Sequence, residues 1–116
     1  LFPSIKTSLD DKEKVLKFLK LCKSNILLKG NTTLIGSYKK IIKNTHSSNE
    51  LAVIGSGDVL AGIIASLVGD NKMSIIEAAA AAAWLHGDIA RKYGKGLISE
   101  DLIKGIQPAL KRLAKK

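Results

Sequence analysis

The sequence predicts an α/β fold, and three observations support that class. Short apolar runs of the strand type occupy residues 26–28, 33–35 and 40–43. Apolar positions at helical spacing precede these runs and return after residue 58. The chain is 46% hydrophobic but only 4% aromatic, so its interior must be aliphatic and rich in alanine. Such an interior favours close packing of helices on a sheet.

The segment 9–22 is expected to form a surface helix. Its apolar side chains recur at helical spacing among lysines and acids, and the acids gather in the first turn, where they complement the helix dipole. Ser8 is the candidate N-cap. Cys22, the single cysteine, is expected to be a small buried side chain at the end of this helix.

A hairpin is expected next in the chain. The runs 33–35 and 40–43 flank Gly36 and Ser37 as the two arms of a hairpin flank its turn. The polar residues 44–50 then form a loop that leads to a glycine-rich turn.

Three helices are expected in the second half of the chain. The first follows Asp58 and is apolar or small on both sides, which predicts that both sides are buried. The second begins with a capping box at Ser74 and runs through six alanines to Tyr93. The third starts at Ser99, and Pro108 should kink or restart it. Too few strands are present to close a sheet, so we expect one domain over 1–116 that is truncated at its N-terminal end.

The charge of the chain does not favour nucleic-acid binding. The net charge of +9 arises from 19 basic and 10 acidic residues, but the lysines are scattered and no aromatic residues lie between them as a stacking platform. A lone cysteine permits no internal disulfide and indicates a reducing, cytoplasmic location. No signal peptide is visible, and the longest apolar run is interrupted by Glu77, so we expect no membrane span.

The turn at 55–58 carries the strongest chemical signal. Glycines let backbone N–H groups approach an anion, and the following helix directs its unpaired amides and its positive dipole end at the same point. Asp58 is then the group able to accept a proton. The alternative is structural, because an Asp at a helix start commonly caps backbone donors.

Four segments resemble, in order and spacing, the C-terminal part of the ADP/ATP-dependent NAD(P)H-hydrate dehydratases, which belong to the ribokinase-like superfamily. These segments are 27–35, 52–64, 83–87 and 96–102, and they extend across nearly the whole chain. The resemblance implies the C-terminal portion of a three-layer α/β fold, in which helices pack on a mainly parallel sheet with a short hairpin.

The resemblance also implies roles for individual residues. The residues expected to bind the adenine nucleotide are Lys29, Gly30, Asn31, Thr32, Thr33 and Gly57. The amides of Gly55, Ser56 and Gly57 would form the anion hole, and Asp58 would meet the hydrated nicotinamide ring as the catalytic, substrate-binding residue.

The implied reaction removes water from hydrated NADH or NADPH, with ADP or ATP and Mg²⁺. Phosphate transfer to the ring hydroxyl would turn a poor leaving group into a good one. A homo-oligomer is expected. The alternatives are a ribokinase-like kinase for a small molecule, an inactive remnant that still binds nucleotide, and a basic module for polyanions.

Several residues depart from the family pattern or carry no assigned chemistry. Val53 and Ile54 stand where the family has a hydroxyl and a small residue, so they either narrow the phosphate approach or pack under the turn. The family's earlier substrate segments would precede Phe2. His86 is expected to be a packing residue, and His46 has no neighbour at the spacing of a zinc site, so no metal ligand is assigned.

Overall fold

The computed structural model describes residues 10–21, 24–30, 32–37 and 40–114. The elements follow one another as α1 (Asp11–Leu21), β1 (Ile26–Leu28), β2 (Thr33–Gly36), β3 (Ile41–Asn44), the 3₁₀-helix η1 (Asn49–Leu51), α2 (Ser56–Gly69), α3 (Ile75–Tyr93) and α4 (Ser99–Ala114). Expectations that rest on Ser8, Cys22 and Asn31 lie outside the described residues. The α/β class is confirmed.

The strands form an antiparallel sheet in the order β1-β2-β3, so the expected mainly parallel sheet is wrong for the described residues. Only four residues separate each strand from the next, and connections this short can join only antiparallel neighbours. The expected hairpin is confirmed as β2 and β3, and Ser37 N–H donates to the Lys40 carbonyl oxygen across its turn at 2.8 Å.

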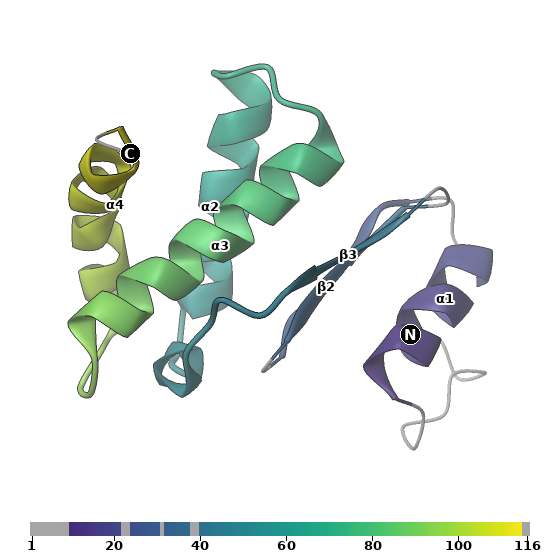
Figure 1. Ribbon diagram of the computed structural model, residues 1–116, viewed down its shortest axis with the longest axis horizontal. Helices are drawn as coiled ribbons and strands as arrows, with labels where there is room; N and C mark the ends of the chain where they lie inside the picture. Colours follow the sequence, from purple (N-terminus) through teal and green to yellow (C-terminus); the bar gives the residue numbers. More distant parts are fainter. Residues whose placement is uncertain (1–9, 22–23, 31, 38–39, 115–116) are drawn as a thin grey trace.

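The elements lie in layers on the two sides of this sheet (Figure 1). Helix α1 packs against β1 and β2 on one side, while α3 contacts β2 and β3 on the other. Helices α2 and α4 pack on α3, and α4 lies on the side of the molecule away from the sheet (Figure 1). Asp10 lies just before α1, and its Oδ1 accepts the Glu13 N–H at 2.8 Å, as an N-cap does.

Small side chains set the spacing between the layers. Ile35 of β2 is buried against Ala79 and Ala83 of α3, and the short alanines let the helix approach the strand closely. On the other face, a Cβ at Gly36 would lie 2.6 Å from Cγ1 of Val15 in α1. The sheet is therefore held between two helices that require small residues at their contacts.

Helix α2 is covered on one side only. Leu60 and Ile63 enter the main core with residues of α3 and α4, as expected. The small residues of the opposite side, Ala61 and Gly62 among them, are exposed, so the expectation that both sides are buried is wrong. The reason is that, among the described elements, α2 packs mainly against α3 and α4, and these cover the side that carries Leu60 and Ile63.

The boundaries of the last two helices follow from local chemistry. Ser74 caps α3 by accepting the Glu77 N–H at 3.3 Å, and the helix ends at Tyr93, both as the sequence predicted. Gly94 follows with a positive φ. Helix α4 continues through Pro108, so the predicted restart is wrong. The carbonyl that loses its partner belongs to Lys104, an exposed residue where water can replace the missing N–H. No helix in the described ranges is both long and apolar enough to cross a membrane.

Two helix-interior glycines are predicted to respond oppositely to substitution by alanine. A Cβ at Gly87 of α3 would lie 1.9 Å from the His46 carbonyl oxygen, whereas one at Gly62 of α2 meets nothing within 4 Å. We expect Gly87→Ala to lower the free energy of unfolding by about 1–3 kcal/mol or more through overpacking. Gly62→Ala should raise it by about 0.5–1 kcal/mol. Urea unfolding measures both, and equal stability of the two variants would contradict this packing.

Candidate functional site

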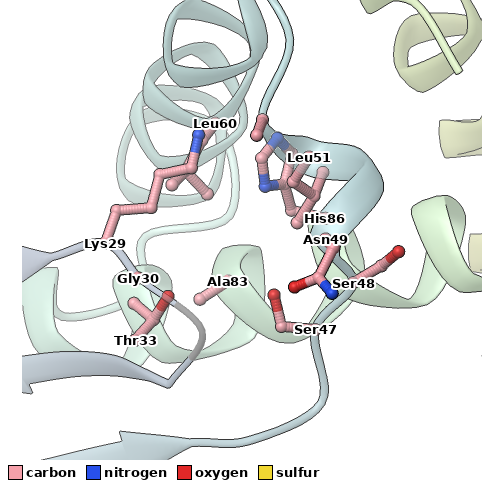
Figure 2. Close-up of a pocket in the computed structure, with 11 residues that line it drawn as sticks. Lys29, Gly30, Thr33, Ser47, Ser48, Asn49, Leu51, Leu60, Ala83 and His86 are labelled. Atoms are coloured by element: carbon pink, nitrogen blue, oxygen red, sulfur yellow. The ribbon is translucent and has the colours of Figure 1, made fainter.

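A pocket of about 320 Å³ lies between the end of β1, the start of β2 and the segment that leads into α2. Figure 2 shows Lys29, Gly30 and Thr33 on the sheet side and Ser47 to Asn49 opposite them. The lining residues are Lys29, Gly30, Thr33, Ser47, Ser48, Asn49, Leu51, Ala52, Leu60, Ala83 and His86.

Ser56, the first residue of α2, joins the elements around the pocket. Its Oγ donates to the Leu51 carbonyl oxygen at 2.7 Å and accepts the Lys29 ammonium at 2.7 Å. Its carbonyl oxygen accepts the Nε2–H of His86 at 3.0 Å. Only 2% of Ser56 is exposed, so these are interior hydrogen bonds that fix the helix start to β1, η1 and α3.

His86 is the buried titratable group of the pocket wall. Burial, together with the nearby charge of Lys29, lowers the pKa of His86 to about 4, and the hydrogen bond to Ser56 opposes this shift only in part. The ring is therefore neutral at pH 7, with the proton on Nε2. The expectation of a packing residue agrees with this geometry, although His86 also lines the pocket.

Lys29 supplies a positive charge at the pocket wall. It follows β1 directly, and the strand's end directs its side chain toward the start of α2. Partial burial lowers the pKa of Lys29 from its ordinary value of 10.5. Its single recorded hydrogen bond in the described chain, to Ser56, leaves ammonium protons for an anion in the pocket.

The start of α2 presents open backbone donors. Gly55 precedes the helix with φ +87°, a conformation that favours glycine, and makes no side-chain cap. The Ser56 N–H donates to the Val53 carbonyl oxygen at 3.2 Å. Within the described residues, the N–H groups of Gly57 and Asp58 have no acceptor, and a Cβ at Gly57 would meet nothing within 4 Å. Two amides at the positive end of the helix dipole are thus left without an acceptor in the described chain.

Asp58 lies exposed in the first turn of α2. In the described part of the chain its carboxylate makes no hydrogen bond or ion pair, so no capping bond of the kind left open by the sequence is seen. The carboxylate therefore takes no part in the described hydrogen bonds of the fold and can accept a proton.

The structure brings some of the sequence-predicted site residues together and separates others. Lys29, Gly30 and Thr33 line the pocket, and Ser56 is hydrogen-bonded to Lys29. Thr32 is half-buried but does not line it. The remaining residues predicted for the anion hole and the reaction, Gly55, Gly57 and Asp58, lie at the start of α2 beside the pocket and not in its lining.

Sequence reasoning missed the wall contributed by residues 47–52. Residues 44–50 were predicted only as a connecting loop, but three of them, Ser47, Ser48 and Asn49, line the pocket together with Leu51 and Ala52. The local signal of this segment is Ser48, which caps η1 by accepting the Glu50 N–H at 3.1 Å. A capped turn immediately before a glycine motif indicates an ordered segment, and the serine that forms this cap can be recognised in the sequence.

The two bulky residues that depart from the family pattern do not narrow the pocket. Ile54 is 98% exposed, so it does not pack under the turn, and Val53 is half-buried. Neither lines the pocket. The Ile54 carbonyl oxygen accepts a hydrogen bond from Ser99 Oγ, which ties this turn to the start of α4.

The fold and the pocket define the class of protein. It is an α/β protein with a pocket beside which a lysine at the end of a strand contacts the start of a helix that a glycine precedes. The chain belongs to the NAD(P)H-hydrate dehydratase family, whose profile matches residues 1–108. This confirms the resemblance recognised in the sequence.

Three relatives illustrate the match. The chain is 42% identical to the ADP-dependent (S)-NAD(P)H-hydrate dehydratase of Neisseria meningitidis over 93 residues, which is 78% of this chain and 31% of the relative. It is 34% identical to the enzyme of the same name from Natrialba magadii over 74% of this chain and 34% of the relative. It is 37% identical to the bifunctional NAD(P)H-hydrate repair enzyme of Archaeoglobus fulgidus over 78% of this chain and 20% of the relative. The chain thus spans about a third of the length of the first two relatives.

The pKa of His86 predicts how stability depends on pH. The unfolded chain binds a proton at His86 near pH 6.5, whereas the folded chain does so only at about 4. Stability from this group is therefore complete above about pH 6.5 and falls as the pH drops toward 4, by up to about 3 kcal/mol. His86→Gln keeps a side-chain donor and cannot titrate, so urea unfolding from pH 7.5 to 4.5 should show a shallower decline. An identical decline in both proteins would contradict the assignment.

Proposed function

We propose that the pocket binds the phosphates of an adenine nucleotide used to dehydrate hydrated NADH or NADPH. The observation that carries this proposal is the pairing of the Lys29 ammonium with the start of α2, where the Gly57 and Asp58 amides have no partner among the described residues. An ammonium and a helix N-terminus that meet at one place attract a polyanion, and ADP or ATP is such an anion.

The proposed chemistry uses Asp58 as a base. Its carboxylate takes the proton from the ring hydroxyl as the terminal phosphoryl group of the nucleotide transfers to that oxygen. The carbon–oxygen bond then breaks, inorganic phosphate leaves, and loss of a second proton restores the nicotinamide double bond. The nucleotide loses one phosphate in each turnover.

Magnesium in this proposal is carried by the nucleotide. The described residues contain no group of three or more His, Cys, Asp or Glu side chains that could hold a metal ion. Mg²⁺ commonly binds through substrate phosphates with one or two carboxylates, and Asp58 is the carboxylate beside the open amides. When bound, the ion would neutralise phosphate charge.

Binding of the nucleotide separates this proposal from a polyanion-binding module. We expect Lys29→Ala to weaken binding of Mg²⁺-ADP by roughly 10- to 100-fold, through loss of a charged hydrogen bond. Gly57→Ala should weaken it by about tenfold, because its methyl group occupies the approach to the amides. Gly62→Ala, a change of the same type farther along α2, is the matched control and should bind normally. Calorimetry measures all three, and equal affinities would contradict the proposed phosphate site.

Turnover tests the reaction itself. Hydrated NADH and ADP are supplied to the protein, and the return of NADH absorbance is followed. Asp58→Asn should lose turnover by about 100-fold or more, because a general base contributes at least that factor. Nucleotide binding by the wild type without turnover would support the inactive-remnant alternative, and Asp58→Asn with full activity would rule out the base.

A further inference from the structure

Residues 47–52 form one wall of the pocket, and contacts outside this segment must hold it in place. This segment contains one turn of 3₁₀-helix, and its own hydrogen bonds are local, from Leu51 N–H to Ser48 and from Ala52 N–H to Asn49, both at 3.2 Å. Ser56 holds its C-terminal end through the Leu51 carbonyl oxygen. Its N-terminal end begins immediately after His46.

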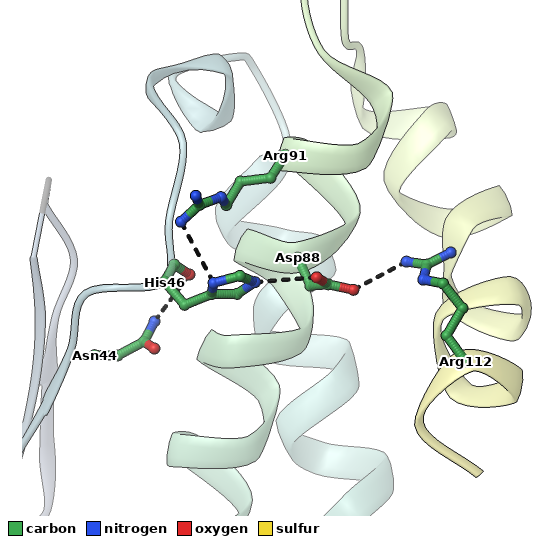
Figure 3. Close-up of polar contacts among 5 residues, drawn as sticks. All are labelled: Asn44, His46, Asp88, Arg91 and Arg112. Carbon is green, nitrogen blue, oxygen red and sulfur yellow. Dashed lines mark hydrogen bonds and ion pairs between the residues drawn. The ribbon is translucent and has the colours of Figure 1, made fainter. Parts of the chain in front are cut away.

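His46 is held by three contacts with α3. Its ring stacks on Trp84, with ring centroids 4.7 Å apart and planes 12° from parallel. Its Nε2 lies 3.0 Å from Oδ1 of Asp88, and its Nδ1 lies 3.4 Å from Nη1 of Arg91 (Figure 3). A neutral ring with its proton on Nε2 satisfies both, by donating to Asp88 and accepting from Arg91.

The backbone at His46 also fits closely against α3. The His46 carbonyl oxygen would lie 1.9 Å from a Cβ at Gly87, so only glycine permits the segment to cross the helix here. Asn44 at the end of β3 donates to the same oxygen at 3.5 Å. Side chain and backbone therefore fix the segment at one point.

Asp88 extends this contact to α4. Its second oxygen accepts from Nη2 of Arg112 at 2.9 Å, and its side chain is only 11% exposed. Burial alone would raise the pKa of Asp88, but the hydrogen bonds from His46 and Arg112 outweigh it and hold that pKa below its ordinary value. The carboxylate is thus charged and shared between the pocket segment and the C-terminal helix, as Figure 3 shows.

We propose that His46 is a positioning residue for the pocket: it fixes the wall of residues 47–52 against α3, and Asp88 with Arg112 extends that support to α4. The inference rests on the proposed function only for the identity of the ligand. The arrangement of His46, Trp84 and Asp88 concerns the wall itself, so it can be tested with and without nucleotide.

Hydrogen exchange of the full chain tests the wall without any ligand. His46→Ala should raise exchange at the Glu50, Leu51 and Ala52 amides by about tenfold. His46→Gln, whose amide can donate to Asp88, should restore most of the protection. Val15→Ala, which removes buried volume between α1 and the sheet, is the control for general destabilisation and should not raise exchange selectively at 50–52.

A matched pair of variants tests whether α4 supports the wall of residues 47–52. Arg112→Ala should raise exchange at residues 50–52, whereas Lys111→Ala, an exposed neighbour on the same helix, should not. Trp84 is the only tryptophan, so its fluorescence reports loss of the His46 stack directly. Its emission should change in His46→Ala and stay as in wild type in Lys111→Ala.

The nucleotide experiment then separates the two proposals. If wild type binds Mg²⁺-ADP, His46→Ala should weaken that binding by about tenfold while Val15→Ala leaves it unchanged. If the wall responds to His46→Ala but wild type binds no ADP, the proposed function fails and the positioning role stands. Unchanged exchange at 50–52 in His46→Ala, or an increase spread evenly over the chain, overturns the positioning role.

Discussion

The hydrogen bonds of Ser56 are the constraint on which the candidate site depends. One residue joins the end of β1 through Lys29, the 3₁₀-turn through Leu51 and the alanine-rich helix through His86. The three partners come from different parts of the fold, namely the end of β1, η1 and α3, so the start of α2 has a single position relative to the sheet and to α3. With the first residue fixed in this way, the next two amides remain open at a defined place.

The hydrogen bonds of Ser56 also bring Lys29 and His86 together, and this bears on the charge of both groups. Burial of the His86 ring, and secondly the nearby ammonium of Lys29, lower the pKa of His86, so the neutral imidazole is the favoured state. Lys29 therefore provides the positive charge of the pocket wall, while His86 serves as a donor to a backbone carbonyl. This division suits a pocket for an anion, because the charge lies at its edge and the interior stays neutral.

Small residues make the site possible by letting elements approach one another. Gly36 leaves room for Val15 of α1 to pack on the sheet, and Ala83 lets β2 pack closely on α3. Gly87 leaves room for the segment that carries His46 to cross α3. Larger side chains at these points would separate the layers and widen the cleft between them. Close layers keep Lys29, the start of α2 and α3 within hydrogen-bond reach of one another.

The sequence by itself determined the features that depend on neighbours in the chain. The strands, the Ser74 cap, the end of α3 at Gly94 and the placement of Lys29 and the glycine turn near one site could be predicted, because caps, periodicity and the family's motifs are local patterns. The antiparallel sheet also follows from the four-residue connections between its strands. Only the tertiary structure decided the exposed side of α2 and the network of His46 with Asp88 and Arg112. Residues 42 and 24 positions apart meet in that network, and no spacing rule relates them. Their contact follows from which helices pack together, which is a property of the whole core.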